Sequence, residues 1–273
     1  MNEIITRRRR RPGQPSWGRA LLYLYAGLVF AFLMVPLLIV FPISFSSASY
    51  LQFPPPGFSL RWYEAYFQDY SWLDSTYRSL KIAAATTVLA TVLGTMMAFS
   101  LVRGRYPGRE TINQLSMTPL LVPTIIYSVA IYGLFSQLRL IGDWRGIVLA
   151  HTVLAIPYVV IIVSASLKTV DPRLEQAAMG LGASRLKAVW RVTLPIIRPA
   201  LVSAMFLAFV SSFDELVVAM FLGGANMTLP KKMFDNIMNE IDPTIAAVSV
   251  MQVLLVCVAL GLSYRFGSGA RPV

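Results

Sequence analysis

Six long stretches of the chain are almost entirely apolar, and the polar residues gather in the segments between them. Each stretch has roughly the 20 apolar residues that a helix needs to cross the hydrocarbon core of a bilayer. Prolines such as Pro36, Pro119 and Pro157 interrupt some stretches, which membrane helices tolerate when neighbouring groups satisfy the freed carbonyls. We expect an all-α, polytopic helical bundle. The predicted spans are residues 20–44, 78–101, 115–136, 147–167, 199–221 and 245–264.

The composition leads to the same class of protein. The chain has 273 residues, of which 56% are hydrophobic and 14% are charged, and its mean hydropathy is +0.62. An average soluble domain carries about 25% charged residues. The apolar residues also come in blocks rather than in amphipathic stripes. The lipid bilayer is therefore the solvent that sets the lengths of the helices.

Basic residues fall mainly on one side of the predicted bundle. Because positively charged loops stay in the cytoplasm, both termini and the loop at 168–198 are expected to be cytoplasmic. The expected organisation is a basic segment at 1–19, a transmembrane domain at 20–264 and a short tail at 265–273. The arginine run at 7–11 raises the possibility of nucleic-acid binding. Its place just before a membrane helix is explained by topology and anionic lipid, so we expect lipid and no nucleic acid as its partner.

Motifs for catalysis or nucleotide binding are missing from the sequence. It contains no G-x-x-x-x-G-K-[ST] phosphate-binding loop, no H-E-x-x-H and no G-x-S-x-G. We expect no catalytic, cofactor-binding or metal-binding residue, and hence no enzyme. Cys257 is the only cysteine, and His151, the only histidine, lies inside the fourth predicted span. For His151 a hydrogen-bonded structural role is favoured, and a proton relay is the alternative.

The charged segment between the fourth and fifth spans has the pattern of a helical hairpin. Leu174, Ala177, Ala178 and Leu181 recur at the spacing of one helix face. Asp171 followed by proline is a typical helix start, and a glycine at 182 allows a sharp turn before a second helix at 183–193. Small residues on the exposed face would let another protein approach closely. The alternative is a solvated connector that carries topology-determining charges.

The spacing in this hairpin resembles the EAA loop of binding-protein-dependent ABC importer permeases, which is written E-A-A, three residues, G, nine residues, I, any residue, L-P. Gln176 stands where the family has glutamate, with Glu175 one place earlier, and Val192 stands for isoleucine. The glutamine loses a negative charge, so a salt bridge from that position is not expected. The residues that carry the resemblance, and that would couple to the ATPase, are Glu175, Gln176, Ala177, Ala178, Gly182, Leu194 and Pro195.

The resemblance implies a function and a set of partners. The chain would be a multi-pass permease subunit in a bacterial-type inner membrane, and the loop would be the coupling helix that docks on a separate ATP-binding cassette subunit. That subunit would bind ATP and Mg. A second, identical or related permease subunit and an extracytoplasmic solute-binding protein would complete the importer. The outer segments at 45–77 and 222–244, with Trp62 and Trp72, would suit docking of the binding protein, or their aromatic residues would form an interfacial belt.

Two adjacent acids are the only carboxylates within any predicted span. Asp214 and Glu215 lie toward the outer half of the fifth span, about 24 Å along a helix from Arg198, and Ser211 shares a face with Asp214. Ionisable groups at such depth are costly and mark transport pathways, and only one of two successive residues can face a cavity squarely. An organic cation would neutralise them. The alternatives are an ion pair with the partner permease or a cap on a helix break.

The stretch from Ser212 to Glu215, followed by Thr228, Leu229 and Pro230, resembles the spermidine/putrescine branch of these permeases. The resemblance implies a polyamine or a similar organic cation as cargo. A permease for another small solute, of the ferric iron, thiamine, opine or phosphonate type, is the alternative. An ATP-independent secondary transporter is a further alternative, but no internal repeat supports it.

Overall fold

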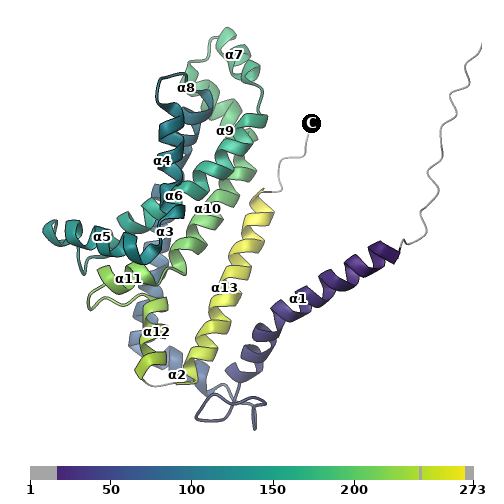
Figure 1. Cartoon of the computed structure of the whole chain (residues 1–273), viewed down its shortest axis with the longest axis vertical. Helices are drawn as coiled ribbons and strands as arrows, with labels where there is room; N and C mark the ends of the chain where they lie inside the picture. The colour runs from purple at the N-terminus through teal and green to yellow at the C-terminus, as the bar shows by residue number, and fades with distance from the viewer. Residues whose placement is uncertain (1–16, 240–241, 268–273) are drawn as a thin grey trace, which may run out of the picture.

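The structure is a computed structural model of the chain that describes residues 17–239 and 242–267, and the regular elements in this part are helices. Most of the predicted basic segment at 1–19 and most of the tail at 265–273 lie outside the described residues. Helices run along the long axis of the molecule, and a hairpin projects from one end (Figure 1). Four helices in the described part are long and apolar enough to cross a membrane. They are α1 (Trp17–Ser44), α3 (Tyr70–Arg103), α6 (Trp144–Thr169) and α13 (Thr244–Gly267).

Two further spans are present as bent pairs of helices, so the described part has up to six spans. The prediction of an all-α, polytopic bundle is confirmed. The first pair is α4 (Arg109–Leu121) with α5 (Thr124–Gln137), and the second is the segment 185–196 with α10 (Arg198–Phe213). That segment consists of α8 (Arg185–Ala188), the π-helix η1 (Val189–Thr193) and α9 (Leu194–Ile196). The remaining helices are α2 (Arg61–Gln68), α7 (Pro172–Gly180), α11 (Val217–Leu222) and α12 (Leu229–Asn239).

Two predicted spans differ from continuous helices. The stretch 115–136 bends by 105° between α4 and α5, because Val122 is extended, with φ −84° and ψ 127°, before Pro123. Proline disfavours helical backbone at the residue before it. The stretch 199–221 contains a second break, since α10 ends at Phe213 and α11 begins at Val217. Because membrane helices tolerate proline, the positions of the prolines in the sequence do not predict where a helix ends.

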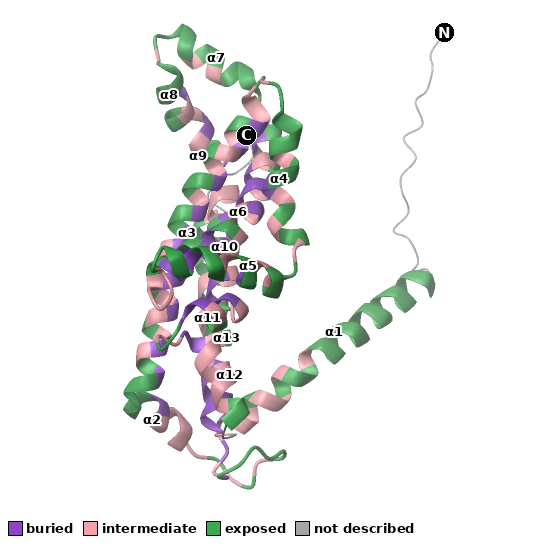
Figure 2. Cartoon of the chain, turned by 60° about the vertical axis from the view of Figure 1, so that its left-hand side comes forward, coloured by how far each residue is buried: buried purple, intermediate pink, exposed green. Residues whose placement is uncertain are grey.

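The centre of the bundle is the contact between α3 and α6. Small residues on α3, Ala90 and Ala98, are fully buried against Val159 and Val163 of α6. Between them lies Gly94, where an added Cβ would be 2.7 Å from the Cβ of Val159. Small residues at such positions let membrane helices approach closely. Figure 2 shows the buried residues concentrated in this central column.

Helix α1 stands apart from the central column and exposes most of its apolar surface (Figure 2). None of the most hydrophobic window of α1 is buried inside the chain. It packs against α13, near the end of the molecule opposite the hairpin (Figure 1). Its other faces are therefore available to lipid or to another subunit.

The end opposite the hairpin has its own apolar cluster. Trp72 at the start of α3 is only 2% exposed, and it belongs to one apolar cluster with Tyr66 of α2, Phe213 of α10 and Leu229 of α12. The sequence had suggested that Trp72 docks a binding protein or belongs to an interfacial aromatic belt. Its burial excludes both roles. Buried aromatic side chains contribute large apolar contact areas, and here one of them anchors the start of α3 in this cluster.

We expect Gly94→Ala to destabilise the protein, although alanine favours helix formation over glycine. Overpacking a well-packed contact costs about 1–3 kcal/mol, whereas alanine gains at most about 1 kcal/mol in a helix. Thermal unfolding in detergent measures the difference. Gly133→Ala is the matched control, because an added Cβ at Gly133 meets nothing within 4 Å. Equal melting temperatures for the two variants would contradict the close contact.

Candidate functional site

The hairpin predicted at 171–199 forms at one end of the bundle, from α7 and the segment 185–196 (Figure 1). Asp171 caps α7, since its carboxylate accepts a hydrogen bond from the Arg173 amide at 2.9 Å. Pro172 is the first residue of α7, and Gly182 makes the turn with φ +88°. Only glycine adopts this conformation without steric cost. The local sequence therefore determines the hairpin as predicted.

The hairpin presents an uncovered surface with a shallow hollow. Leu181 is 91% exposed at the tip, Gln176 and Ala177 are exposed, and Ala178 is half-buried. The hollow has a volume of about 320 Å³. It is lined by Ala178, Leu181, Gly182, Ala183, Lys187, Ala188, Arg191 and Val192. An apolar tip beside small residues and two cations is a surface that a partner protein would cover.

Glu175 points into the chain rather than out of it. Its Oε1 accepts a hydrogen bond from the hydroxyl of Thr193 at 2.7 Å and lies 3.6 Å from Nε of Arg103 at the end of α3. Leu194 is half-buried and Pro195 is exposed farther along the second arm. Arg103 could not be found from the sequence, because nothing in the spacing relates the end of the second span to the hairpin.

The second polar site lies at the break after α10. Asp214 is the C-cap of α10, and its amide donates a hydrogen bond to the carbonyl of Val210. Glu215 turns toward α11 and caps it: its carboxylate accepts hydrogen bonds from the amides of Val217 at 3.0 Å and Val218 at 2.8 Å. A carboxylate at a helix amino terminus satisfies amides that have no partner within the helix. One of the alternatives left open by the sequence, a cap on a helix break, is therefore present for Glu215.

His151 joins this break to α6. It is 2% exposed, its Nδ1 lies 2.8 Å from Oγ of Ser212, and its Nε2 lies 3.4 Å from Oε2 of Glu215. Buried polar groups are expensive unless they are paired. Nδ1 of His151 is paired with Ser212, whereas Nε2 lies near Glu215 but makes no hydrogen bond within the described residues. The geometry supports the structural interpretation of the lone histidine.

Asp214 faces away from this buried group. It is exposed, and its Oδ1 accepts a hydrogen bond from Nε2 of Gln252 on α13 at 3.3 Å. Ser211, one turn earlier, is half-buried. The two adjacent acids thus diverge, as expected for successive residues. Asp214 is the one of the pair that remains accessible, and Gln252 is a neighbour that the sequence analysis did not identify.

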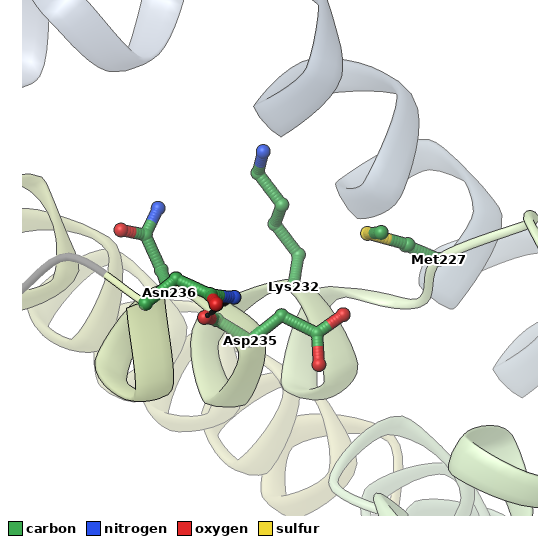
Figure 3. A pocket seen from close by; sticks show the side chains of 5 residues that line it. Met227, Lys232, Asp235 and Asn236 are labelled. Atoms are coloured by element: carbon green, nitrogen blue, oxygen red, sulfur yellow. Dashed lines mark hydrogen bonds between the residues drawn. The ribbon is translucent and has the colours of Figure 1, made fainter.

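A larger hollow, of about 380 Å³, lies beside α12 at the end opposite the hairpin. Its lining is Met227, Lys232, Asp235, Asn236 and Asn239. In Figure 3, Lys232 and Asn236 extend from α12 on one side, and Met227 points toward them from the preceding loop. Nζ of Lys232 lies 5.3 Å from the ring centre of Trp72. Within residues 17–239 and 242–267, no three His, Cys, Asp or Glu side chains gather as a metal site.

Comparison with known families gives one clear match. Residues 90–270 match the family model described as "Binding-protein-dependent transport system inner membrane component". This range contains the hairpin, the break after α10 and helix α13.

Three curated relatives illustrate the range of similar proteins. The putrescine transport system permease protein PotI of Escherichia coli K12 is 36% identical over 232 residues, covering 82% of each chain. The spermidine/putrescine transport system permease protein PotC of Haemophilus influenzae is 30% identical, over 84% of this chain and 89% of its own. The molybdenum transport system permease protein ModB of Mycobacterium bovis is 32% identical, over 68% of this chain and 77% of its own.

Solved structures share the fold at lower identity. A chain of a bacterial ABC transporter that imports the polysaccharide alginate superposes with a TM-score of 0.71 at 18% identity, covering 94% of this chain and 99% of that one. A chain of the MetNI methionine ABC transporter, in inward-facing conformations, gives 0.60 at 20% identity, over 73% of this chain and 96% of that one. At these identities the likeness shows the fold.

We expect Glu215→Ala to open the first turn of α11. Loss of a capping side chain costs about 1–2 kcal/mol, which corresponds to roughly tenfold faster amide exchange. Hydrogen exchange at Val217 and Val218 measures this effect directly. Asp214→Ala is the matched control, since Asp214 makes no cap on α11 in the structure. Unchanged exchange in Glu215→Ala would contradict the assigned capping role.

Proposed function

The chain belongs to the family of binding-protein-dependent transport system inner membrane components, and from this premise we propose that it is the transmembrane permease subunit of an ATP-driven ABC importer for polyamines. The observation that carries the proposal is the exposed hairpin at 171–199, which a bundle of apolar helices would not need for its own folding. A docking surface of this form is what an importer requires to receive work from a separate motor. The chain would be a transporter subunit and no enzyme.

The ATP-binding cassette subunit would dock on the hairpin, and it would bind ATP and Mg. The residues that we assign to coupling are those of the EAA-like motif: Glu175, Gln176, Ala177, Ala178, Gly182, Leu194 and Pro195. Support comes from the exposed tip at Leu181 and the hollow beside Ala178. A ligand can shift a conformational equilibrium only through differential contacts with the two states, and the hairpin supplies the contact surface.

The orientation that we propose places the hairpin end in the cytoplasm of a bacterial-type cell. The start of the described α1 and the end of α13 both point away from the α2 and α12 end (Figure 1). Both termini would then be cytoplasmic, in agreement with the basic residues near them. The proposed organisation is a basic segment at 1–19, a transmembrane domain at 20–264 and a tail at 265–273.

A second permease subunit, identical or related, would complete the pathway. The argument is the uncovered surface of α1 and the accessible Asp214, which a single bundle leaves open to its surroundings. A solute-binding protein would dock at the opposite end, over α12 and the hollow beside Lys232. Polar and charged side chains on α12 form a surface of the kind found in reversible protein contacts.

The cargo that we propose is putrescine, spermidine or a similar organic cation. PotI and PotC carry these cargoes in their names, and Asp214 offers an accessible carboxylate at a break in a membrane helix. Ser211 and Glu215 complete the proposed pathway set, with Glu215 holding the break in place. The ModB relative is named for molybdenum, so family membership alone does not select the cargo. The charge at Asp214 favours a cation.

We expect Asp214→Asn to reduce the uptake of labelled putrescine. A hydrogen bond to a charged group contributes about 1.5–3 kcal/mol, so the apparent affinity should fall roughly tenfold or more. Uptake by the complete importer in vesicles, competed with amines and uncharged solutes, measures this. Ser203→Ala is the control on an exposed part of α10. Unaltered putrescine affinity in Asp214→Asn would show that this carboxylate does not contact the cargo.

We expect Gly182→Val to impair docking while the protein still inserts in the membrane. A side chain in left-handed backbone conformation costs about 1–2 kcal/mol, and this strain acts against the hairpin conformation that docks. Gly180→Val is the matched control, because an added Cβ at Gly180 meets nothing within 4 Å and only Gly182 of the two has a positive φ. Co-purification of the ATPase gives the readout. Equal recovery of the ATPase with both variants would show that docking does not depend on the turn at Gly182.

A further inference from the structure

Three side chains join the hairpin to the end of α3. Arg103 is the last residue of α3, and its Nη2 donates a hydrogen bond to the carbonyl of Val170 at 2.8 Å. Its Nε lies 3.6 Å from Oε1 of Glu175. The same oxygen accepts a hydrogen bond from Oγ1 of Thr193 at 2.7 Å. We name Arg103, Glu175 and Thr193 the clasp.

The clasp is shielded from solvent. The side chains of Arg103 and Glu175 are 15% and 13% exposed, and Thr193 is fully buried. Salt screens such a pair far less than an exposed pair, and removal of one partner leaves a poorly hydrated charge. Exposed ion pairs on flexible side chains hold elements loosely. A shielded ion pair supported by two hydrogen bonds instead fixes the hairpin against α3.

The clasp bridges parts of the chain that are distant in sequence. Its bond from Arg103 to Val170 joins residues 67 positions apart. Val170 is the C-cap of α6, Glu175 lies on α7 and Thr193 ends η1. Val170 also belongs to the central core cluster, together with Leu167 and Ile197. Four elements therefore meet at one carboxylate and one guanidinium.

Helix α3 runs from the clasp to the neighbourhood of Asp214. It has 34 residues, which make a rod about 50 Å long. At its other end Trp72 packs in one cluster with Phe213, the residue before Asp214. Packed interiors transmit displacement because they are dense and not easily compressed. A movement of α3 along or about its axis therefore reaches the break that holds Asp214.

We propose that the clasp is a positioning device that transmits displacement of the hairpin to α3, and through α3 to the cargo site. Arg103, Glu175 and Thr193 are positioning residues in this assignment. Glu175 acts inside the chain, and the exposed Gln176 stays at the docking face. The inference rests on the proposed function, because it needs an ATPase docked on the hairpin. Without the clasp, the hairpin would act on α3 only indirectly, through α6 and α10, to which it is connected along the chain.

Arg103→Ala and Glu175→Gln test the proposal in the complete importer, reconstituted in lipid vesicles with its ATPase and solute-binding protein. Three quantities are measured for each: co-purification of the ATPase, ATP hydrolysis, and putrescine uptake per ATP hydrolysed. We expect the ATPase to remain bound and active. Uptake per ATP should fall about fivefold or more, the lower end of typical coupling between sites. The double variant should be no worse than the more impaired single variant, because the residues act as one unit.

Matched variants separate transmission from general damage. Arg105→Ala removes an exposed arginine two positions beyond the clasp and should leave uptake per ATP unchanged. Thr193→Val keeps the branched shape but loses the hydroxyl donor, so it should lower the ratio, whereas Thr193→Ser keeps the donor and should restore it. If Thr193 has a purely structural role, these two variants will differ in folding but not in putrescine uptake per ATP hydrolysed.

Each outcome bears on a distinct claim. If clasp variants retain the ATPase and still show the wild-type uptake per ATP, the clasp does not transmit displacement from the hairpin. Loss of the ATPase from these variants would also overturn the proposal, because the three residues would then shape the docking surface. Failure of the wild-type chain to bind any ATPase would instead refute the proposed function itself.

Discussion

Helices α3 and α6 pack tightly at Gly94, where an added Cβ would lie 2.7 Å from the Cβ of Val159, and the rest of the structure depends on this contact. In lipid there is little hydrophobic force between helices, so close packing of small residues must hold them together. Gly94 lies nearer the Arg103 end of α3, so this contact holds against α6 the part of α3 that carries Arg103. One end carries Arg103 beside the hairpin, and the other carries Trp72, which shares an apolar cluster with Phe213 at the end of α10. A single rod therefore connects the two polar sites of the chain.

The break after α10 shows how a membrane protein places charge in an apolar region. Backbone groups freed by a break must find partners within the protein, and Glu215 meets this need for the amides of α11. In the interior, His151 pairs with Ser212 through Nδ1, and its Nε2 lies 3.4 Å from Oε2 of Glu215. With its neighbour held in this way, Asp214 is left accessible beside Gln252. Two adjacent acids thus have different surroundings, one structural and one open to cargo.

Features that follow from local patterns could be predicted from the sequence. Apolar length predicted the long helices, and the cap at Asp171 with the glycine turn predicted the hairpin. The bend at Pro123 could not be predicted, because proline is tolerated within membrane helices and only the packing of neighbours decides whether a helix continues. The contact between Arg103 and Glu175 could not be predicted either, because it depends on how α3 packs against α6.

The cargo site was predictable only in part. The sequence indicated that one of Asp214 and Glu215 would face a cavity, but the direction of each depends on where α10 ends. Trp72 is a second example of this limit. A tryptophan near the end of a span suggests a position at the membrane interface, but this one is buried in a tertiary cluster. The arginine run at 7–11 lies outside the described residues, so its expected role at the membrane surface stays a prediction.

The central claim is that the hairpin receives work from a separate ATPase, and a crosslink from Ala178 tests it most directly. Cys257 is the only cysteine, so Cys257→Ser gives a background in which Ala178→Cys carries the only thiol of this chain. The account predicts that a short thiol crosslinker captures the ATPase subunit in the assembled complex. Met96→Cys, on an exposed face of α3, should not capture it. Absence of any ATPase adduct from Ala178→Cys in an active complex would contradict the account.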